Sequence, residues 1–128
     1  MRTVEGRLGG SDNSDLPAIR NHLAVGVEAL EQATQWVLQT IRQDPNAAHA
    51  ASVNYMMLTG YVCGGWQMAR AAIAARSMLA SGGDEPFCRA KIATARFYAE
   101  QILPKASALL TAVKSGASTA FALDEEQF

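Results

Sequence analysis

The strongest constraint on the fold is a hydrophobic repeat in residues 85–114, which alternates steps of four and three residues. Eight successive positions of the repeat are apolar: Cys88, Ile92, Ala95, Ala99, Ile102, Ala106, Leu109 and Val113. This spacing keeps side chains on one face of an α-helix and does not match the alternating faces of a β-strand. The segment therefore predicts a long helix that begins at the acid-then-proline sequence Asp84-Glu85-Pro86. We expect a kink at Pro104, because proline lacks an amide donor and crowds the preceding turn.

Two further helices are predicted upstream. Residues 16–43 carry two neighbouring rows of apolar residues at helical spacing: Leu16, Ile19, Leu23, Val27, Leu30, Val37 and Ile41. Asp44-Pro45 then begins a helix that runs to about Leu79 and ends at Ser81-Gly82-Gly83. Because this second helix is apolar nearly all round, we expect it to be the most buried one and to bend at its glycines.

Short connections between long helices make neighbouring helices antiparallel. The chain is therefore predicted to be all-α, an antiparallel bundle of three long helices with room for a short C-terminal helix in residues 121–128. The helical-bundle domain would comprise residues 15–128. Residues 1–14 are rich in Gly, Ser, Asp and Asn, which predicts a flexible lead-in or an inter-domain linker.

The composition excludes several classes of function. The chain has 128 residues, with 11 basic and 12 acidic side chains and a net charge of −1, so we expect no nucleic acid and no anionic membrane as its partner. Residues 45–69 contain no charged side chain, but their many polar groups argue against a membrane span. The N-terminus shows no secretory signal, and we expect a cytoplasmic protein.

No arrangement of residues points to catalysis by this chain. The two histidines have no metal-ligand partner at helical spacing, and no glycine-rich loop joins a strand to a helix. Cys63 and Cys88 fall on apolar helix faces, so we expect buried free thiols rather than nucleophiles. We therefore predict no catalytic, cofactor-binding or metal-binding residue. Basic side chains gather in the second half, where Arg96 and Glu100 are spaced for an ion pair and an anion-binding patch is the alternative.

The predicted second helix carries two further features. Small residues let helix axes approach closely, so Gly60, Gly64 and Gly65 are predicted to lie at the tightest helix contact. The most polar stripe of this helix has no charged residue before its last member: His49, Ser52, Met56, Thr59, Cys63, Gln67 and Arg70. Stripes that face solvent usually carry Lys and Glu, so this one fits a surface that another protein or domain covers. A fully interior helix with locally bonded polar groups is the alternative.

Three segments resemble the extra C-terminal helical domain of some bacterial acyl-CoA dehydrogenases. Residues 54–70, from Asn-Tyr-Met-Met-Leu-Thr-Gly-Tyr to Val-Cys-Gly-Gly-Trp-Gln-Met-Ala-Arg, resemble the middle of that domain. Residues 91–104 are similar to its following helix, and residues 122–128 are similar to the C-termini of those enzymes. The resemblance covers most of residues 14–128, and its motifs are packing motifs.

The resemblance implies an appended, non-catalytic helical domain that packs on a catalytic body or supports oligomer contacts. Enzymes of this family oxidise acyl-CoA thioesters in fatty-acid metabolism, using FAD and a glutamate base in a dehydrogenase domain that this sequence lacks. FAD is thus implied only for that absent domain, and the implied partner is the dehydrogenase body or a second copy of the chain. Two alternatives remain, a free-standing helical homodimer and a small-molecule binder with a pocket near Gly60, Trp66 and Pro104.

Overall fold

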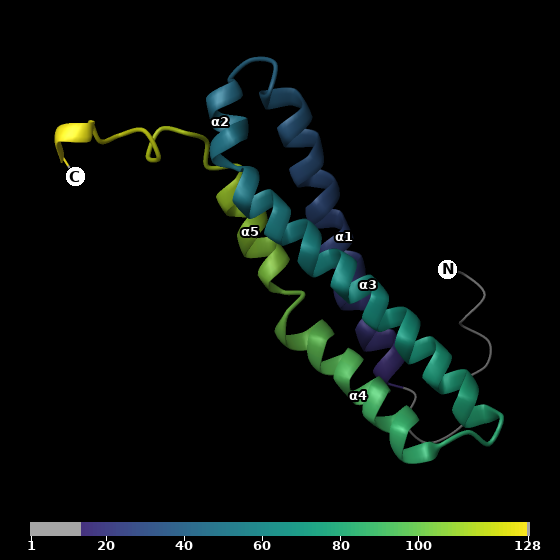
Figure 1. Cartoon of the computed structure of the whole chain (residues 1–128). Helices are drawn as coiled ribbons and strands as arrows, with labels where there is room; N and C mark the ends of the chain where they lie inside the picture. Colours follow the sequence, from purple (N-terminus) through teal and green to yellow (C-terminus); the bar gives the residue numbers. More distant parts are fainter. Residues whose placement is uncertain (1–13, 128) are drawn as a thin grey trace.

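The computed structural model describes residues 14–127, which form five α-helices and one short 3-10 helix. The elements are α1 (Asp15–Thr40), α2 (Pro45–Ala50), α3 (Ser52–Ala80), α4 (Glu85–Gln101), α5 (Lys105–Val113) and the 3-10 helix η2 (Glu125–Gln127). Figure 1 shows α1, α2 with α3, and α4 with α5 packed against one another as long rods. The described residues contain no strand, so the predicted all-α bundle is confirmed. Residues 1–13 of the predicted linker lie outside the described residues.

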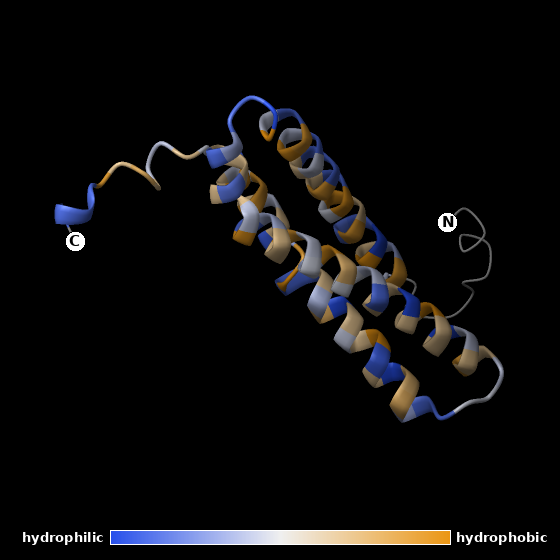
Figure 2. Cartoon of the chain, turned by 45° about the horizontal axis from the view of Figure 1, so that its top comes forward, coloured by the Kyte–Doolittle hydropathy of each residue, from blue (hydrophilic) through white to orange (hydrophobic). Residues whose placement is uncertain are grey.

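The predicted helix starts and stops are in place. The carboxylates of Asp44 and Asp84 each accept a hydrogen bond, at 3.1 Å, from the amide three residues ahead. At the end of α3, Gly82 has a φ of +80°, a left-handed conformation that glycine adopts without strain. The amide of Gly83 donates to the carbonyl of Met78 at 2.8 Å and closes the helix. The turn between α1 and α2 is strongly hydrophilic (Figure 2).

The predicted bend of the second helix lies elsewhere than expected. The helix is interrupted at Ala51, between α2 and α3, and runs without a break through all of its glycines. The cause is packing, because Ala47, Ala48 and Ala51 are buried and α2 contacts α1. The kink at Pro104 is confirmed. There the amide of Leu103 reaches back to the carbonyl of Tyr98 at 3.1 Å, and residues 102–104 form a turn between α4 and α5.

The core is built largely from alanine, which brings the helix axes close together. Its first cluster joins α1, α3 and α4 around residues such as Ile19, Ala72 and Cys88. The second joins α1, α3 and α5 around Leu58 and Val113. None of the described helices combines the length and the apolarity that crossing a membrane requires.

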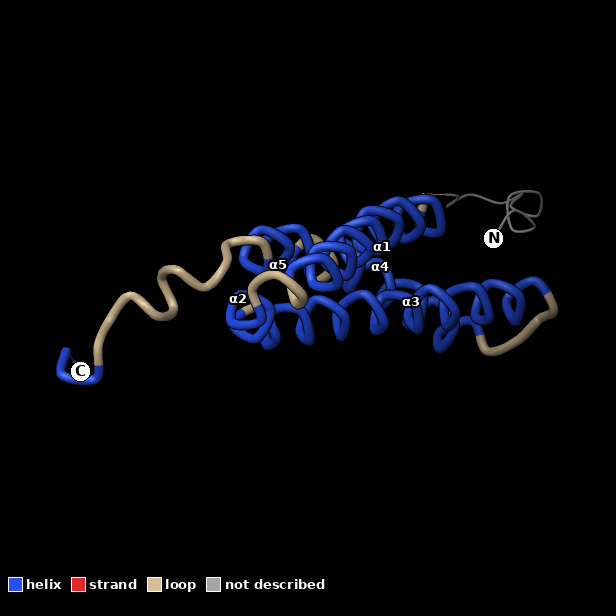
Figure 3. Tube along the Cα trace, turned by 90° about the horizontal axis from the view of Figure 1, so that it is seen from above, coloured by secondary structure: helices blue, strands red, loops and turns tan. Residues whose placement is uncertain are grey.

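The second helix was expected to be the most buried one, and it is exposed to much the same extent as the first: 14 of 29 residues on α3 and 11 of 26 on α1 are exposed. Although α3 packs against α1, α4 and α5, half of its surface has no helix over it. Figure 3, seen from above, shows α3 along one side of the bundle and α1 along the other. An apolar pattern on all sides therefore reflects a helix with one core face and one uncovered face.

Candidate interaction surface

The three glycines that were predicted at a helix contact differ in their surroundings. A Cβ atom at Gly64 would overlap the hydroxyl of Tyr98, and one at Gly65 would lie 2.7 Å from Leu103 Cδ2. A Cβ atom at Gly60 would meet nothing within 4 Å. The structure thus places Gly64 and Gly65 against α4 and the turn that follows it, and places Gly60 at the surface.

The polar stripe of the second helix lies at the surface of the described chain. His49 stands on α2, and the other members lie along α3. All are exposed except Thr59, which is half-buried and donates from its hydroxyl to the carbonyl of Tyr55 at 2.8 Å. A fully interior helix is therefore excluded as the account of this stripe. Cys63 is exposed as well, whereas Cys88 is buried, so the expectation of a buried thiol holds only for Cys88.

The stripe is part of a larger surface that we call the outer face of α3, defined as the exposed residues of that helix. These residues are Ser52, Val53, Met56, Met57, Gly60, Cys63, Trp66, Gln67, Arg70, Ile73, Ala74, Ser77, Met78 and Ala80. Only one of these 14 residues is charged. By the same measure, 3 of 11 exposed residues on α1 and 4 of 11 on α4 are charged. The outer face of α3 is thus the least charged long surface of the described bundle.

Sequence reasoning placed Met56 on this face, where it is 66% exposed. It missed Trp66 and Ile73, which are 53% and 42% exposed, because a single sequence does not reveal which side of an all-round apolar helix is covered. The absence of Lys, Asp and Glu from the whole of α3 was the available signal.

The one charge on the outer face belongs to a small cluster. Arg70 Nη1 donates to Gln67 Oε1 at 3.2 Å, and the guanidinium carbon lies 5.3 Å from the centre of the Trp66 ring. An arginine over an indole ring is an attractive contact, and both residue types are frequent at the centres of protein interfaces.

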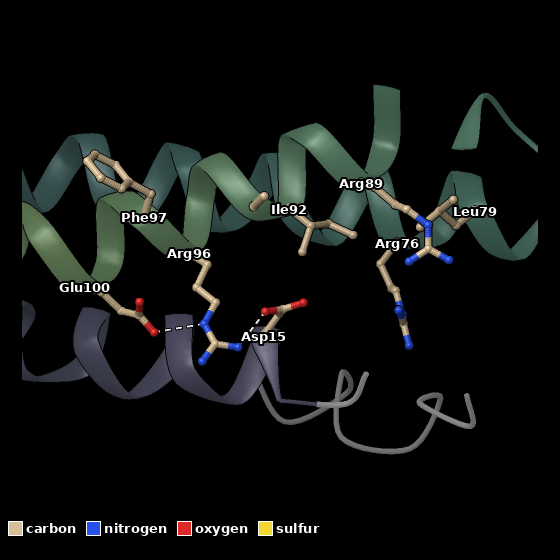
Figure 4. Close-up of a pocket in the computed structure, with 9 residues that line it drawn as sticks. Asp15, Arg76, Leu79, Arg89, Ile92, Arg96, Phe97 and Glu100 are labelled. Carbon is tan, nitrogen blue, oxygen red and sulfur yellow. Dashed lines mark hydrogen bonds and ion pairs between the residues drawn. The ribbon is translucent and has the colours of Figure 1, made fainter. Parts of the chain in front are cut away.

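A second set of charged side chains gathers where α1 begins. Arg96 bonds to Asp15 at 2.7 Å, to Glu100 at 2.8 Å and to Ser14 at 3.0 Å, and Figure 4 shows it reaching from α4 to the start of α1. The hydrogen bond to Asp15, followed by that to Glu100, raises the pKa of Arg96 further above its ordinary value. The predicted Arg96–Glu100 pair is confirmed, and the link to Asp15 is new.

These residues border a hollow of about 430 Å³ that Arg76 and Arg89 also line. Arg89 is paired with Glu85 at 2.7 Å. Two of the three arginines in the lining are paired with carboxylates, Arg89 with Glu85 and Arg96 with Asp15 and Glu100, and the anion-binding alternative stays a prediction. None of Gly60, Trp66 and Pro104 lines this hollow.

The surroundings of Tyr98 alter the acidity of its hydroxyl group. Its hydroxyl donates to the carbonyl of Tyr61 at 3.0 Å and lies over Gly64. Burial raises the pKa of Tyr98 above its ordinary value of 10.0, and the neighbouring Tyr61 and Cys63 add to this rise. This hydrogen bond joins α4 to α3 and ends on a backbone carbonyl. We therefore assign Tyr98 a role in helix packing.

Residues 14–127 contain no buried polar or charged side chain. They also contain no group of three or more His, Cys, Asp and Glu side chains close enough to hold a metal ion.

Comparisons with known proteins identify the family of this chain. The family described as "Acetyl-CoA dehydrogenase C-terminal like" matches residues 1–124. The chain belongs to this family. The match to the C-terminal-like domain begins at residue 1, so it includes the segment predicted as a linker.

A curated relative is the 3-methylmercaptopropionyl-CoA dehydrogenase of Ruegeria pomeroyi, which is 46% identical over 90 residues. The matched part is 70% of this chain but only 15% of that protein. The acetyl-CoA dehydrogenase C-terminal-like domain described here thus corresponds to a small part of a much longer dehydrogenase.

Proposed function

We propose that this chain is a non-catalytic domain that docks on the body of an acyl-CoA dehydrogenase through the outer face of α3. The observation that carries the proposal is the composition of that face, with one charged residue among 14 exposed ones. Three methionines, one tryptophan and one arginine lie on it, which are residue types enriched in protein interfaces. Helix faces that stay in water usually carry Lys and Glu, and this face has neither.

The length of the relative supports a dehydrogenase body as the partner. Most of the Ruegeria pomeroyi enzyme lies outside the part matched by this chain, so a body exists there for such a domain to contact. FAD and the glutamate base of the family belong to that body in this proposal. The cytoplasm and fatty-acid metabolism remain our expectations for the setting of the protein.

The outer face is long enough for a stable contact. A helix of 29 residues is about 43 Å long at the standard rise, and its exposed residues recur along its whole length. Six large apolar side chains of α3 are exposed, and exposed apolar patches on a monomer often mark interaction sites. A contact within an oligomer is the second role that this face can serve, and the test below separates the two roles.

The test uses a hybrid enzyme in which this chain replaces the matching part of the Ruegeria pomeroyi dehydrogenase. Met56→Glu places a charge on the outer face of α3, and Leu38→Glu places one on α1 at a side chain of similar exposure, 64% against 66%. In the isolated chain both variants should stay within about 0.5 kcal/mol of the parent, because both side chains face water.

In the hybrid, only Met56→Glu should release the domain from the body, since it buries an unpaired charge at the contact. Release is measured as faster protease cleavage at the junction, with dehydrogenase activity as the control that the body is folded. Equal cleavage of the two variants would refute docking through α3. Sedimentation of the isolated chain as a stable dimer that Met56→Glu dissociates would support the oligomer role instead.

A further inference from the structure

Arg70 is the one charged residue on the outer face of α3, and its partners in the described chain are neutral. Gln67 accepts one hydrogen bond at 3.2 Å, and Trp66 offers its ring face. No carboxylate of the described residues forms an ion pair with Arg70. Most of its N–H donors therefore point to water in the isolated chain.

Covering this face would remove that water. A buried guanidinium without a counter-charge is strongly destabilising, whereas one that meets a carboxylate in good geometry is tolerated and gives specificity. The contact with Trp66 and Gln67 also fixes the position of the guanidinium before any partner arrives, which lowers the ordering cost of binding.

A second copy of the chain does not supply the missing carboxylate through the same face. Ser52–Ala80 contains no Asp or Glu, so two α3 helices packed face to face would bury both Arg70 side chains without an acid. The acids of α1 and α4 lie on other faces. To reach Arg70 with an acid, a second copy would have to meet the outer face of α3 with a different face of its own.

We infer that the surface covering the outer face of α3 is heterologous and apolar, with a single Asp or Glu carboxylate that receives Arg70. This inference rests on the proposed docking and adds the chemistry of the partner: a dehydrogenase body with an acid surrounded by apolar groups. Arg70 then sets the register in which α3 lies on the body, because the apolar residues around it tolerate sliding.

Two crosslinks in the hybrid enzyme test the inference. A carbodiimide joins a lysine to a carboxylate that touches it, so Arg70→Lys should form a zero-length crosslink to an Asp or Glu of the body. Arg89→Lys is the matched control, because Glu85 lies 2.7 Å from Arg89 on the same helix and should be its only product. Separately, a benzophenone maleimide on Cys63 reports what lies against the face. Cys88 is buried and should not react.

The expected result is a Cys63 photocrosslink to the body together with an Arg70→Lys crosslink to a body carboxylate. A Cys63 photocrosslink to the body without the Arg70→Lys product overturns the carboxylate and leaves docking intact. A Cys63 photocrosslink to a second copy alone overturns both the inference and the proposed function, as does no product beyond the domain itself.

Discussion

The hydroxyl of Tyr98 lies over Gly64, in the space that a side chain at position 64 would occupy. From there it donates to the carbonyl of Tyr61 at 3.0 Å, so one residue of α4 is fixed against two residues of α3. The missing side chain of Gly64 is what allows this hydrogen bond between helices.

A double-mutant cycle should show that Gly64 and Tyr98 act together. Gly64→Ala displaces the Tyr98 hydroxyl and breaks a hydrogen bond worth about 1 kcal/mol. In a Tyr98→Phe background that bond is already absent, so Gly64→Ala should cost about 1 kcal/mol less than in the parent. The free energies of unfolding in urea measure this, and additive effects would show that the two residues do not interact.

Gly65 and Gly60 should respond in opposite directions to alanine. Gly65→Ala forces its Cβ against the buried side chain of Leu103 and should destabilise the chain by about 1–2 kcal/mol. Gly60→Ala meets open space and should stabilise the chain by up to about 1 kcal/mol, because alanine favours helix more than glycine does. Thermal unfolding of the two variants compares them, and equal shifts would contradict the packing described here.

Stability should fall at alkaline pH because of Tyr98. Its pKa in the folded chain is raised above 10.0, so the folded state keeps a proton that the unfolded state releases as the pH passes that value. The contribution is therefore fully present below about pH 10 and is lost above it. Urea unfolding between about pH 8 and pH 11 should show a shallower decline for Tyr98→Phe than for the parent, and parallel curves would argue against a raised pKa.

The start of α1 should depend on Arg96. Arg96→Leu removes the bonds to Ser14 and Asp15, so amide hydrogen exchange should accelerate in the first turns of α1 and remain unchanged in α5. Arg89→Leu is the control, since its ion pair with Glu85 lies within α4. Similar exchange at α1 in the two variants would show that Arg96 does not hold this end of the helix.

The fold was predictable because its signals are local. The apolar repeat from Cys88 to Val113, the caps at Asp44 and Asp84 and the kink at Pro104 each depend on residues within a few positions of one another. The bend at Ala51 was not, because it comes from the packing of α2 against α1, and alanine itself carries no turn signal.

The candidate surface was only partly predictable. The polar stripe was visible as a row without charge before Arg70, but apolar neighbours such as Trp66 were not predicted to lie on the same surface. Periodicity identifies the two faces of a helix only when one of them is polar, and α3 is apolar on both. The link from Arg96 to Asp15 spans 81 positions, and no spacing rule connects residues that far apart.

The most direct test of the central claim is the reactivity of Cys63, which stands in the middle of the outer face of α3. Alkylation of the native protein, followed by mass spectrometry of the peptide that contains Cys63, gives its rate in the isolated chain and in the hybrid enzyme. Docking through α3 predicts fast alkylation in the isolated chain and a rate about tenfold slower in the hybrid, which requires only about 1.4 kcal/mol of docking free energy. Equal rates in the two proteins would show that the outer face of α3 stays in water, and would contradict the account.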